Sequence, residues 1–263
     1  MNYKLIAYDI DDTLLKSDLS VSCRTLDAIA RANEKGVLNC VATGRMYRAT
    51  EKIRGYGLFG PAVCFGGAQI IDPKSGEVIF ERCIENDLAQ RIVQFAREHD
   101  LYVMAYDDKT YYYEYPCEYS EFYERLSGFA GVQANLEDLT LHTPKMLLIG
   151  DAQRIEQTMP HARQAFGDEL YISKSRATFM ELVDKTVSKG LALEQIGKLY
   201  KIPKEQMIAL GDGLIDVSMV DYAGLGIAME NAVDEVKAVA DYITASNDED
   251  GVALAIEKFV LKD

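Results

Sequence analysis

Histidines are scarce in this sequence and its cysteines lie far apart, which argues against several kinds of site. The three histidines, His99, His142 and His161, are scattered along the middle of the chain, so we expect neither a zinc site nor a Ser-His-Asp triad. The cysteines form no C-x-x-C pair; they are Cys23, Cys40, Cys64, Cys83 and Cys117. An odd number of widely spaced cysteines fits a reducing compartment better than a disulfide framework.

Basic residues and long apolar runs are also lacking. The 263-residue chain has 28 Lys and Arg against 42 Asp and Glu, a formal net charge of −14. Nucleic-acid backbones and anionic membranes bind basic surfaces, so we expect neither partner. No apolar run is long enough to span a bilayer, and a core-type strand follows Met1 too closely to leave room for a signal peptide. We therefore expect a cytoplasmic protein that is a monomer or a homodimer.

Strands and helices alternate in the two outer parts of the chain, residues 1–82 and 183–263. The predicted strands are Leu5–Tyr8, Val37–Ala42, Pro61–Phe65, Met207–Leu210 and Leu225–Ala228. Ser22 is expected to cap the helix after the first strand, and Gly36 to end it. Such alternation indicates parallel strands with right-handed crossovers. We predict an α/β fold whose core is a Rossmann-like parallel sheet with helices on both faces.

Residues 83–182 show a different pattern. Asn86 is expected to cap a helix. The strands predicted here are Leu101–Tyr106, Thr110–Tyr115, Lys145–Ile149 and Phe179–Val183. Helices interleaved with antiparallel strands indicate an inserted α+β domain, which makes the core domain discontinuous. The tyrosines between Tyr111 and Tyr123 either line a pocket or pack one face of a strand.

Carboxylates follow two of the predicted core strands. Asp9 and Asp11 come directly after Leu5–Tyr8, and Asp212 and Asp216 follow Met207–Leu210. The carboxyl ends of parallel strands are where open α/β sheets bind ligands. Close carboxylates repel each other, and a hard cation such as Mg²⁺ removes that repulsion. A solvated turn after the first strand is the alternative for the Asp9 segment taken alone.

Two further segments could bind phosphate. Thr43 and Gly44 follow a buried strand and are predicted to open a helix, where a hydroxyl and free N–H groups favour an anion. Lys189 opens another predicted helix, so its cation adds to the favourable helix dipole.

The order of these segments resembles a known family. Asp9-x-Asp11-x-Thr13, Thr43-Gly44-Arg45, Lys189 and Gly211-Asp212…Asp216 look like the motifs of the haloacid dehalogenase superfamily of phosphotransferases. The insertion at 83–182 is similar to the large α/β cap of Cof-type sugar phosphatases. The resemblance covers essentially the whole chain, and it implies a cap that closes over the active site and selects the substrate.

The resemblance also assigns roles to individual residues. Asp9 would be the nucleophile that forms an aspartyl-phosphate, and Asp11 would be the general acid and base. Thr43, Gly44 and Lys189 would bind the phosphoryl group. Mg²⁺ would be bound by the carboxylates of Asp9 and Asp212 and the backbone carbonyl of Asp11. Asp216 would lie behind them and orient a water molecule or Lys189. Two roles stay open for Arg45: it packs on a helix and forms a surface ion pair, or it contacts the groups of the active site.

The sequence departs from the family at two positions. Ile215 and Gly66 stand where relatives usually have asparagine. We therefore expect a Mg²⁺-dependent phosphatase of small phosphorylated metabolites, most of all sugar phosphates, with weakened activity. The main alternative is a phospho-ligand binding or regulatory protein that turns over poorly. A phosphohexomutase-like phosphotransferase is a third interpretation that no residue specifically supports.

Overall fold

The computed structural model describes residues 3–262, which divide into two compact units. One unit contains the chain up to Phe80 and from Ser188 onward, and the other is Glu81–Val187. The border expected at 182/183 falls inside strand β11 (Phe179–Asp184), so the chain leaves the inserted unit only after that strand ends. Among the described residues, no helix combines the length and apolarity needed to cross a bilayer.

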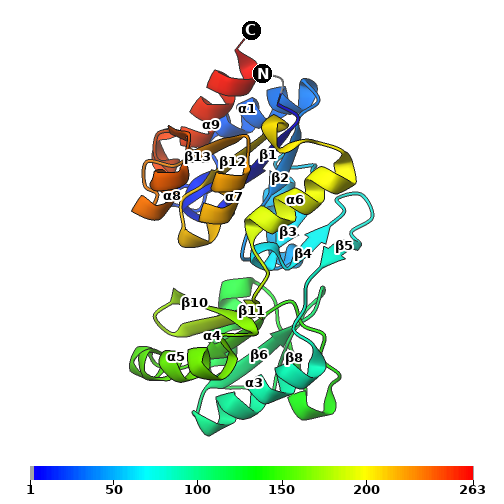
Figure 1. The fold of residues 1–263 in the computed structure, drawn as a ribbon, viewed down its shortest axis with the longest axis vertical. Coiled ribbons are helices and arrows are strands. Elements are labelled where there is room, and N and C mark those ends of the chain that lie inside the picture. Colours follow the sequence, from blue (N-terminus) through cyan, green and yellow to red (C-terminus); the bar gives the residue numbers. More distant parts are fainter. Residues whose placement is uncertain (1–2, 263) are drawn as a thin grey trace. The chain divides into compact units, whose positions relative to one another are not determined.

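The first unit is built on a five-stranded parallel sheet (Figure 1). In the order of the sheet, its strands are β14 (Tyr242–Ile243), β13 (Leu225–Ala228), β12 (Met207–Gly211), β1 (Leu5–Tyr8) and β2 (Leu38–Val41). Central strand β1 pairs with β12 and β2 in parallel register, with Tyr8 opposite both Leu210 and Val41. Every residue of β1 is buried, as expected for a strand covered on both faces.

Helices cover both faces of this sheet, as predicted. They are α1 (Cys23–Glu34), α6 (Lys189–Tyr200), α7 (Val217–Tyr222), α8 (Asp234–Val239) and α9 (Gly251–Ile256). Helix α1 packs with α9, whereas α6 and α8 both pack with α7. The crossovers from β1 to β2 and from β12 to β13 run in opposite directions along the sheet, so right-handedness sends α1 and α7 to opposite faces. Ser22 caps α1 by accepting the N–H of Thr25, and Gly36 follows the helix with φ of +79°, both as predicted.

A smaller sheet in the same unit contains β3 (Ala62–Cys64), β4 (Gln69–Ile71) and β5 (Val78–Glu81). The short helix α2 (Glu51–Arg54) precedes it. The turn Phe65–Gly67 joins β3 to β4 with left-handed backbone, and Gly67 has φ of +114°. A Cβ atom on Gly67 would lie only 2.2 Å from the carbonyl oxygen of Ser188. Glycine here therefore allows the turn to approach the N-terminus of α6.

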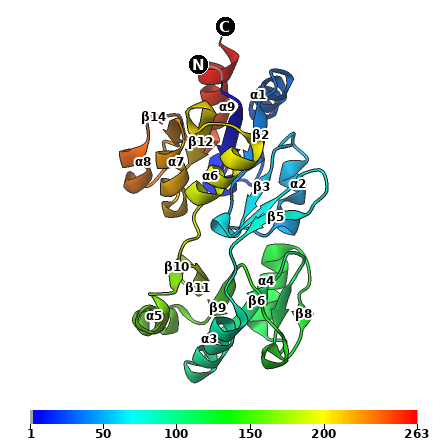
Figure 2. The ribbon, with the colours of Figure 1, turned by 45° about the vertical axis from the view of Figure 1, so that its right-hand side comes forward.

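The second unit contains a six-stranded, mainly antiparallel sheet (Figure 2). Its strands in sheet order are β10 (Leu170–Arg176), β11, β9 (Met146–Ile149), β6 (Tyr102–Tyr106), β7 (Tyr111–Tyr113) and β8 (Val132–Gln133), and only β7 and β8 pair in parallel. Helices α3 (Asn86–Glu98) and α5 (Ala152–Phe166) share a core with one sheet face, which includes Val103, Leu148 and Met180. This antiparallel sheet with helices confirms the expected α+β character of the insertion.

Four helices and strands of this unit were not predicted from the sequence: α4 (Glu118–Ser127), α5, β8 and β10. Helix α5 contains Pro160, and α4 lies among aromatic residues that resemble a strand. The expected cap at Asn86 is wrong, because Glu85 precedes the first turn of α3. The Asn86 side chain instead accepts the N–H of Leu141 at 2.7 Å, so it fixes a distant loop.

Of the tyrosines in the second unit, Tyr115 and Tyr102 help to line a small pocket, whereas Tyr106, Tyr111 and Tyr123 pack against one another. Tyr106 alternates with the core residues of β6, so it faces away from α3 and α5. On that face its ring lies 6.1 Å from the ring of Tyr123 on α4, and Tyr111 lies 4.9 Å from the same ring. Both Tyr106 and Tyr111 are buried. The aromatic strands therefore have one face packed under α4.

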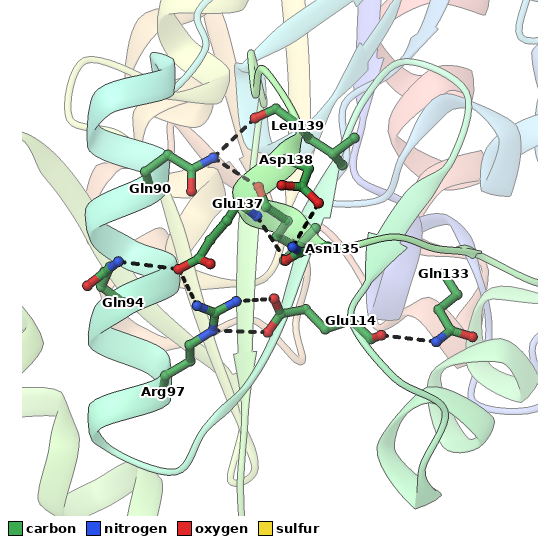
Figure 3. A network of polar contacts seen from close by, with 10 residues as sticks. Gln90, Gln94, Arg97, Glu114, Gln133, Asn135, Glu137, Asp138 and Leu139 are labelled. Atoms are coloured by element: carbon green, nitrogen blue, oxygen red, sulfur yellow. Dashed lines mark hydrogen bonds and ion pairs between the residues drawn. The ribbon is translucent and has the colours of Figure 1, made fainter.

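A polar network fixes the outer side of α3 (Figure 3). Arg97 forms ion pairs with Glu114, after β7, and with Glu137 in the loop that follows β8. Gln90 donates to the carbonyl oxygens of Leu136 and Leu139 at 2.9 and 3.1 Å. The long connection between β8 and β9 is thus held against the helix around the turn Leu136–Asp138.

Candidate active site

Three carboxylates meet where β1 and β12 end. Asp9 follows β1 directly, and its N–H donates to Leu210 of β12 at 3.0 Å. The carboxylates of Asp9, Asp212 and Asp216 place oxygen atoms within 4.8 Å of one another. Parallel pairing of the two strands thus brings together residues that lie about 200 positions apart in the sequence. We call this set the acid cluster.

Lys189 connects two members of the acid cluster. As predicted, it opens α6, whose first turn is capped by Ser188 through the N–H of Leu191. Its ammonium nitrogen lies 2.5 Å from Oδ1 of Asp9 and 2.5 Å from Oδ1 of Asp216, and the side chain is fully buried. Burial disfavours the charge, but the two carboxylates outweigh it and raise the pKa of Lys189 above its ordinary value. Lys189 is therefore a fixed cation in the site.

Asp9 keeps one carboxylate oxygen available. Oδ1 accepts from Lys189, whereas Oδ2 accepts no hydrogen bond from any described residue. The side chain is nearly buried, and this burial raises the pKa of Asp9, while Lys189 opposes the rise. Because Oδ1 is held by Lys189, the carboxylate has a fixed orientation, and Oδ2 is the oxygen that can attack a ligand.

Asp216 has both oxygens occupied by the protein. Oδ1 accepts from Lys189, and Oδ2 accepts the backbone N–H groups of Asp212 and Gly213 at 3.0 and 2.9 Å. A Cβ atom on Gly211 would lie 2.4 Å from Cβ of Asp216, so this close approach depends on glycine. The contacts support the predicted role of Asp216 in orienting Lys189, and they leave it little capacity to bind a metal ion.

Asp212 is held by a residue outside the predicted set. Its Oδ1 accepts from the hydroxyl of Thr13 at 2.6 Å, which links the ends of β12 and β1. Burial is the largest cause that raises the pKa of Asp212 to about 6, and the nearby carboxylate of Asp216 adds to it. Thr13 is part of the first motif, and its place in that motif was the only sign in the sequence that it lies in the site.

Thr43 and Gly44 occupy a loop rather than the start of a helix, contrary to the prediction. The next helical turn begins only at Tyr47. Thr43 is instead fixed by the smaller sheet, since its N–H donates to Val63 at 2.9 Å and its carbonyl accepts from Gly66 at 2.9 Å. Its Oγ1 accepts the N–H of Arg45 at 3.2 Å, which leaves the hydroxyl hydrogen available to a ligand.

Arg45 and Asp11 form a two-pronged ion pair. The Arg45 Nε donates to Asp11 Oδ2 at 2.9 Å, and Nη2 donates to the other oxygen. Paired guanidinium and carboxylate groups of this kind hold each other in one plane. Arg45 therefore contacts the residue expected to act as acid and base, but the ion pair is partly exposed, so both interpretations of Arg45 from the sequence stay open.

Ile215 and Gly66, the two departures from the family, lie beside the loop of Thr43 and Gly44. Ile215 is 41% exposed, and its Cδ1 would be 3.8 Å from a Cβ atom on Gly44. Gly66 has φ of +68°, a conformation that asparagine tolerates and glycine adopts freely. The backbone conformation at position 66 is therefore compatible with either glycine or asparagine. Compared with asparagine, Gly66 lacks only the side-chain amide.

Comparison with known proteins agrees with this arrangement. The sequence profile described as haloacid dehalogenase-like hydrolase matches residues 6–256. Two Bacillus subtilis proteins, YitU and YcsE, are both named 5-amino-6-(5-phospho-D-ribitylamino)uracil phosphatase and are similar to this chain. YitU is 29% identical, and the alignment covers 97% of this chain and 97% of YitU. YcsE is 30% identical, and the alignment covers 99% of this chain and 97% of YcsE. A crystal structure of a haloacid dehalogenase-like hydrolase from Bacteroides thetaiotaomicron has 32% identity and a TM-score of 0.90, covering 98% of this chain and 99% of that one. The chain belongs to the haloacid dehalogenase-like hydrolases, the family that its motifs resemble.

Proposed function

We propose that this hydrolase is a Mg²⁺-dependent phosphatase of small phosphorylated metabolites, with sugar phosphates as the main class. The observation that carries the proposal is the acid cluster with its buried cation. Lys189 holds Oδ1 of Asp9, and Oδ2 of the same carboxylate has no protein partner among the described residues. This is the arrangement that a carboxylate nucleophile requires.

The residues support a two-step reaction. Oδ2 of Asp9 attacks phosphorus while the bond to the leaving oxygen breaks, and Asp11 protonates that oxygen. Asp11 then takes a proton from a water molecule that attacks the phosphorus of the aspartyl-phosphate and regenerates Asp9. Lys189 and the Thr43 hydroxyl bind phosphoryl oxygens, and Asp216 positions Lys189.

The donor set fits Mg²⁺. With Oδ2 of Asp9 reserved for attack, the available donors are the second lone pair of Asp9 Oδ1, the second carboxylate oxygen of Asp212 and, as the group that the family motif supplies, the Asp11 backbone carbonyl. All are hard oxygen donors. Burial and then the neighbouring Asp216 carboxylate raise the pKa of Asp212 to about 6, and a bound cation would favour its ionised form. When bound, the ion withdraws negative charge from the phosphoryl oxygens as a Lewis acid.

The substrate class is supported by the relatives. YitU and YcsE are named for a substrate whose phosphate is carried by a ribityl chain, which is a sugar alcohol. Phosphate monoesters of sugars and sugar alcohols are therefore the first compounds to test. Phosphate release from such a panel should require Mg²⁺ and should disappear in Asp9→Asn. Activity that persists unchanged in excess chelator would refute the metal dependence.

One observation favours the alternative of a phospho-ligand binding protein with poor turnover. Ile215 places an exposed apolar side chain beside Gly44, where relatives usually have an amide. Binding of a sugar phosphate without its hydrolysis over many hours would support this alternative. Turnover of at least one panel compound at rates ordinary for enzymes, about 1 per second or faster, would exclude it.

A further inference from the structure

A second group of metal-binding side chains lies in the unit Glu81–Val187. Glu81, Cys83 and His142 place a carboxylate oxygen, a sulfur and an imidazole nitrogen within 4.8 Å of one another. The Cys83 Sγ lies 3.8 Å from Oε2 of Glu81, and Nε2 of His142 lies 3.2 Å from Oε1 of the same residue. The cysteine and the histidine are 59 positions apart, so the sequence alone gave no sign of this group.

Backbone pairing holds these side chains together. Ile84 and Thr143 form an antiparallel bridge with N–H to O distances of 2.8 and 3.2 Å, next to Cys83 and His142. Both bridge residues are buried, and the Thr143 hydroxyl donates to the carbonyl of Lys145 at 2.6 Å. The three donor groups are thus attached to a fixed part of the backbone, which lowers the cost of ordering them around an ion.

The histidine is oriented as a metal ligand usually is. Its Nε2 faces Glu81, while its Nδ1 lies 3.5 Å from Oε2 of Glu85. A carboxylate behind the second ring nitrogen fixes the tautomer and makes the first nitrogen a better ligand. Glu85 is therefore placed to orient His142 without binding the ion itself.

The donor types point to a borderline-soft ion rather than to Mg²⁺. Thiolate and imidazole favour zinc-class ions, whereas the acid cluster offers oxygen alone. Burial and then the carboxylates of Glu81, Glu85 and Asp184 raise the pKa of the Cys83 thiol to about 12. The carboxylates of Glu81, Glu85 and Asp184 near the sulfur also attract a cation.

We propose that Glu81, Cys83 and His142 bind one divalent ion of the zinc class, with a fourth position open to water. Binding releases the thiol proton to the solvent and forms the metal–sulfur bond. The ion would join the segment that enters this unit, at Glu81 and Cys83, to the loop before β9 that carries His142.

Zinc titration of the full-length protein against a chromophoric chelator, with Mg²⁺ in excess, tests the proposal. We expect one site, with the dissociation constant raised more than about 100-fold by Cys83→Ser or His142→Gln and about tenfold by Glu85→Gln. Cys23→Ser and His161→Gln are matched controls, since both side chains are exposed elsewhere, and they should bind normally. Co²⁺ should give a sulfur-to-metal charge-transfer band in the wild type that Cys83→Ser abolishes.

Asp212→Asn distinguishes this site from the acid cluster. If the proposal holds, zinc binding survives Asp212→Asn, whatever that substitution does to phosphatase activity. Zinc binding that is lost in Asp212→Asn, or unchanged in both Cys83→Ser and His142→Gln, would overturn the proposal. His142 is exposed, so its variant should fold even if replacement of the partly buried Cys83 disturbs the structure.

Discussion

Replacing Asp212 by asparagine should stabilise the metal-free protein while abolishing its activity. The carboxylate of Asp212 lies near those of Asp9 and Asp216, and its pKa is raised to about 6 from an ordinary value near 3.8. Each pKa unit corresponds to about 1.4 kcal/mol, so the ionised group destabilises the folded state by at most about 3 kcal/mol. Because the side chain is only partly buried, solvent screening reduces this to about 1–2 kcal/mol. Asparagine can still accept from Thr13 through its side-chain oxygen.

The effect should depend on pH in a defined direction. The folded protein binds a proton at Asp212 more readily than the unfolded chain does, so the destabilisation is present above pH 6. It disappears as the pH falls through 6 toward 4, where protonation has the same effect as the substitution. The advantage of Asp212→Asn in chelator should therefore be largest at pH 8 and small near pH 4.

Urea unfolding in excess chelator at pH 8 and at pH 4.5 measures this directly, with Asp221→Asn on the exposed side of α7 as the matched control. Addition of Mg²⁺ should stabilise the wild type and leave Asp212→Asn unchanged, because the ion binds only the folded acid cluster. An Asp212→Asn protein that is no more stable than the wild type at pH 8 without metal would show that burial and the neighbouring carboxylate do not destabilise ionised Asp212 as inferred.

Three other substitutions test separate parts of the site. Lys189→Met should lower the free energy of unfolding by about 3–5 kcal/mol and abolish turnover, since two buried carboxylates lose their shared cation; an equally stable variant would contradict this. Arg45→Gln should slow the hydrolysis of alkyl phosphates more than that of p-nitrophenyl phosphate, because only a poor leaving group needs the proton that Asp11 donates. Equal slowing of both substrates would show that the ion pair has only a structural role. Ile215→Asn should raise kcat/KM roughly tenfold, about 1.4 kcal/mol of transition-state stabilisation, and a fall without unfolding would instead favour the ligand-binding alternative.

Much of the core could be predicted because its signals are local. An apolar run that ends in Asp9 fixes both the strand and the place of the acid, and Ser22 and Gly36 bound the first helix as expected. Of the two predicted partners of Asp216, a water molecule or Lys189, the contact with Lys189 is present, because parallel pairing places the ends of β1 and β12 together and α6 begins beside them. The family motifs supplied the roles that no local pattern could give.

The failures arise where tertiary contacts override local patterns. Thr43 follows a strand as predicted, but hydrogen bonds to Val63 and Gly66 hold it in a loop instead of a helix start. The aromatic residues of α4 resemble a strand until Tyr123 is seen to pack across the sheet. Contacts made by long side chains, such as Arg45 with Asp11, leave no periodic signal in a sequence at all.

Trapping of a phosphorylated Asp9 tests the central claim most directly. Asp11→Asn should still release nitrophenolate from p-nitrophenyl phosphate with Mg²⁺, but it lacks the base that hydrolyses the aspartyl-phosphate, so the intermediate should accumulate. Borohydride reduces an acyl phosphate to an alcohol, and peptide mass spectrometry should then find homoserine at position 9. The double variant with Asp9→Asn should give neither the burst of nitrophenolate nor the label. A stoichiometric burst with an unmodified Asp9 would contradict the proposed mechanism.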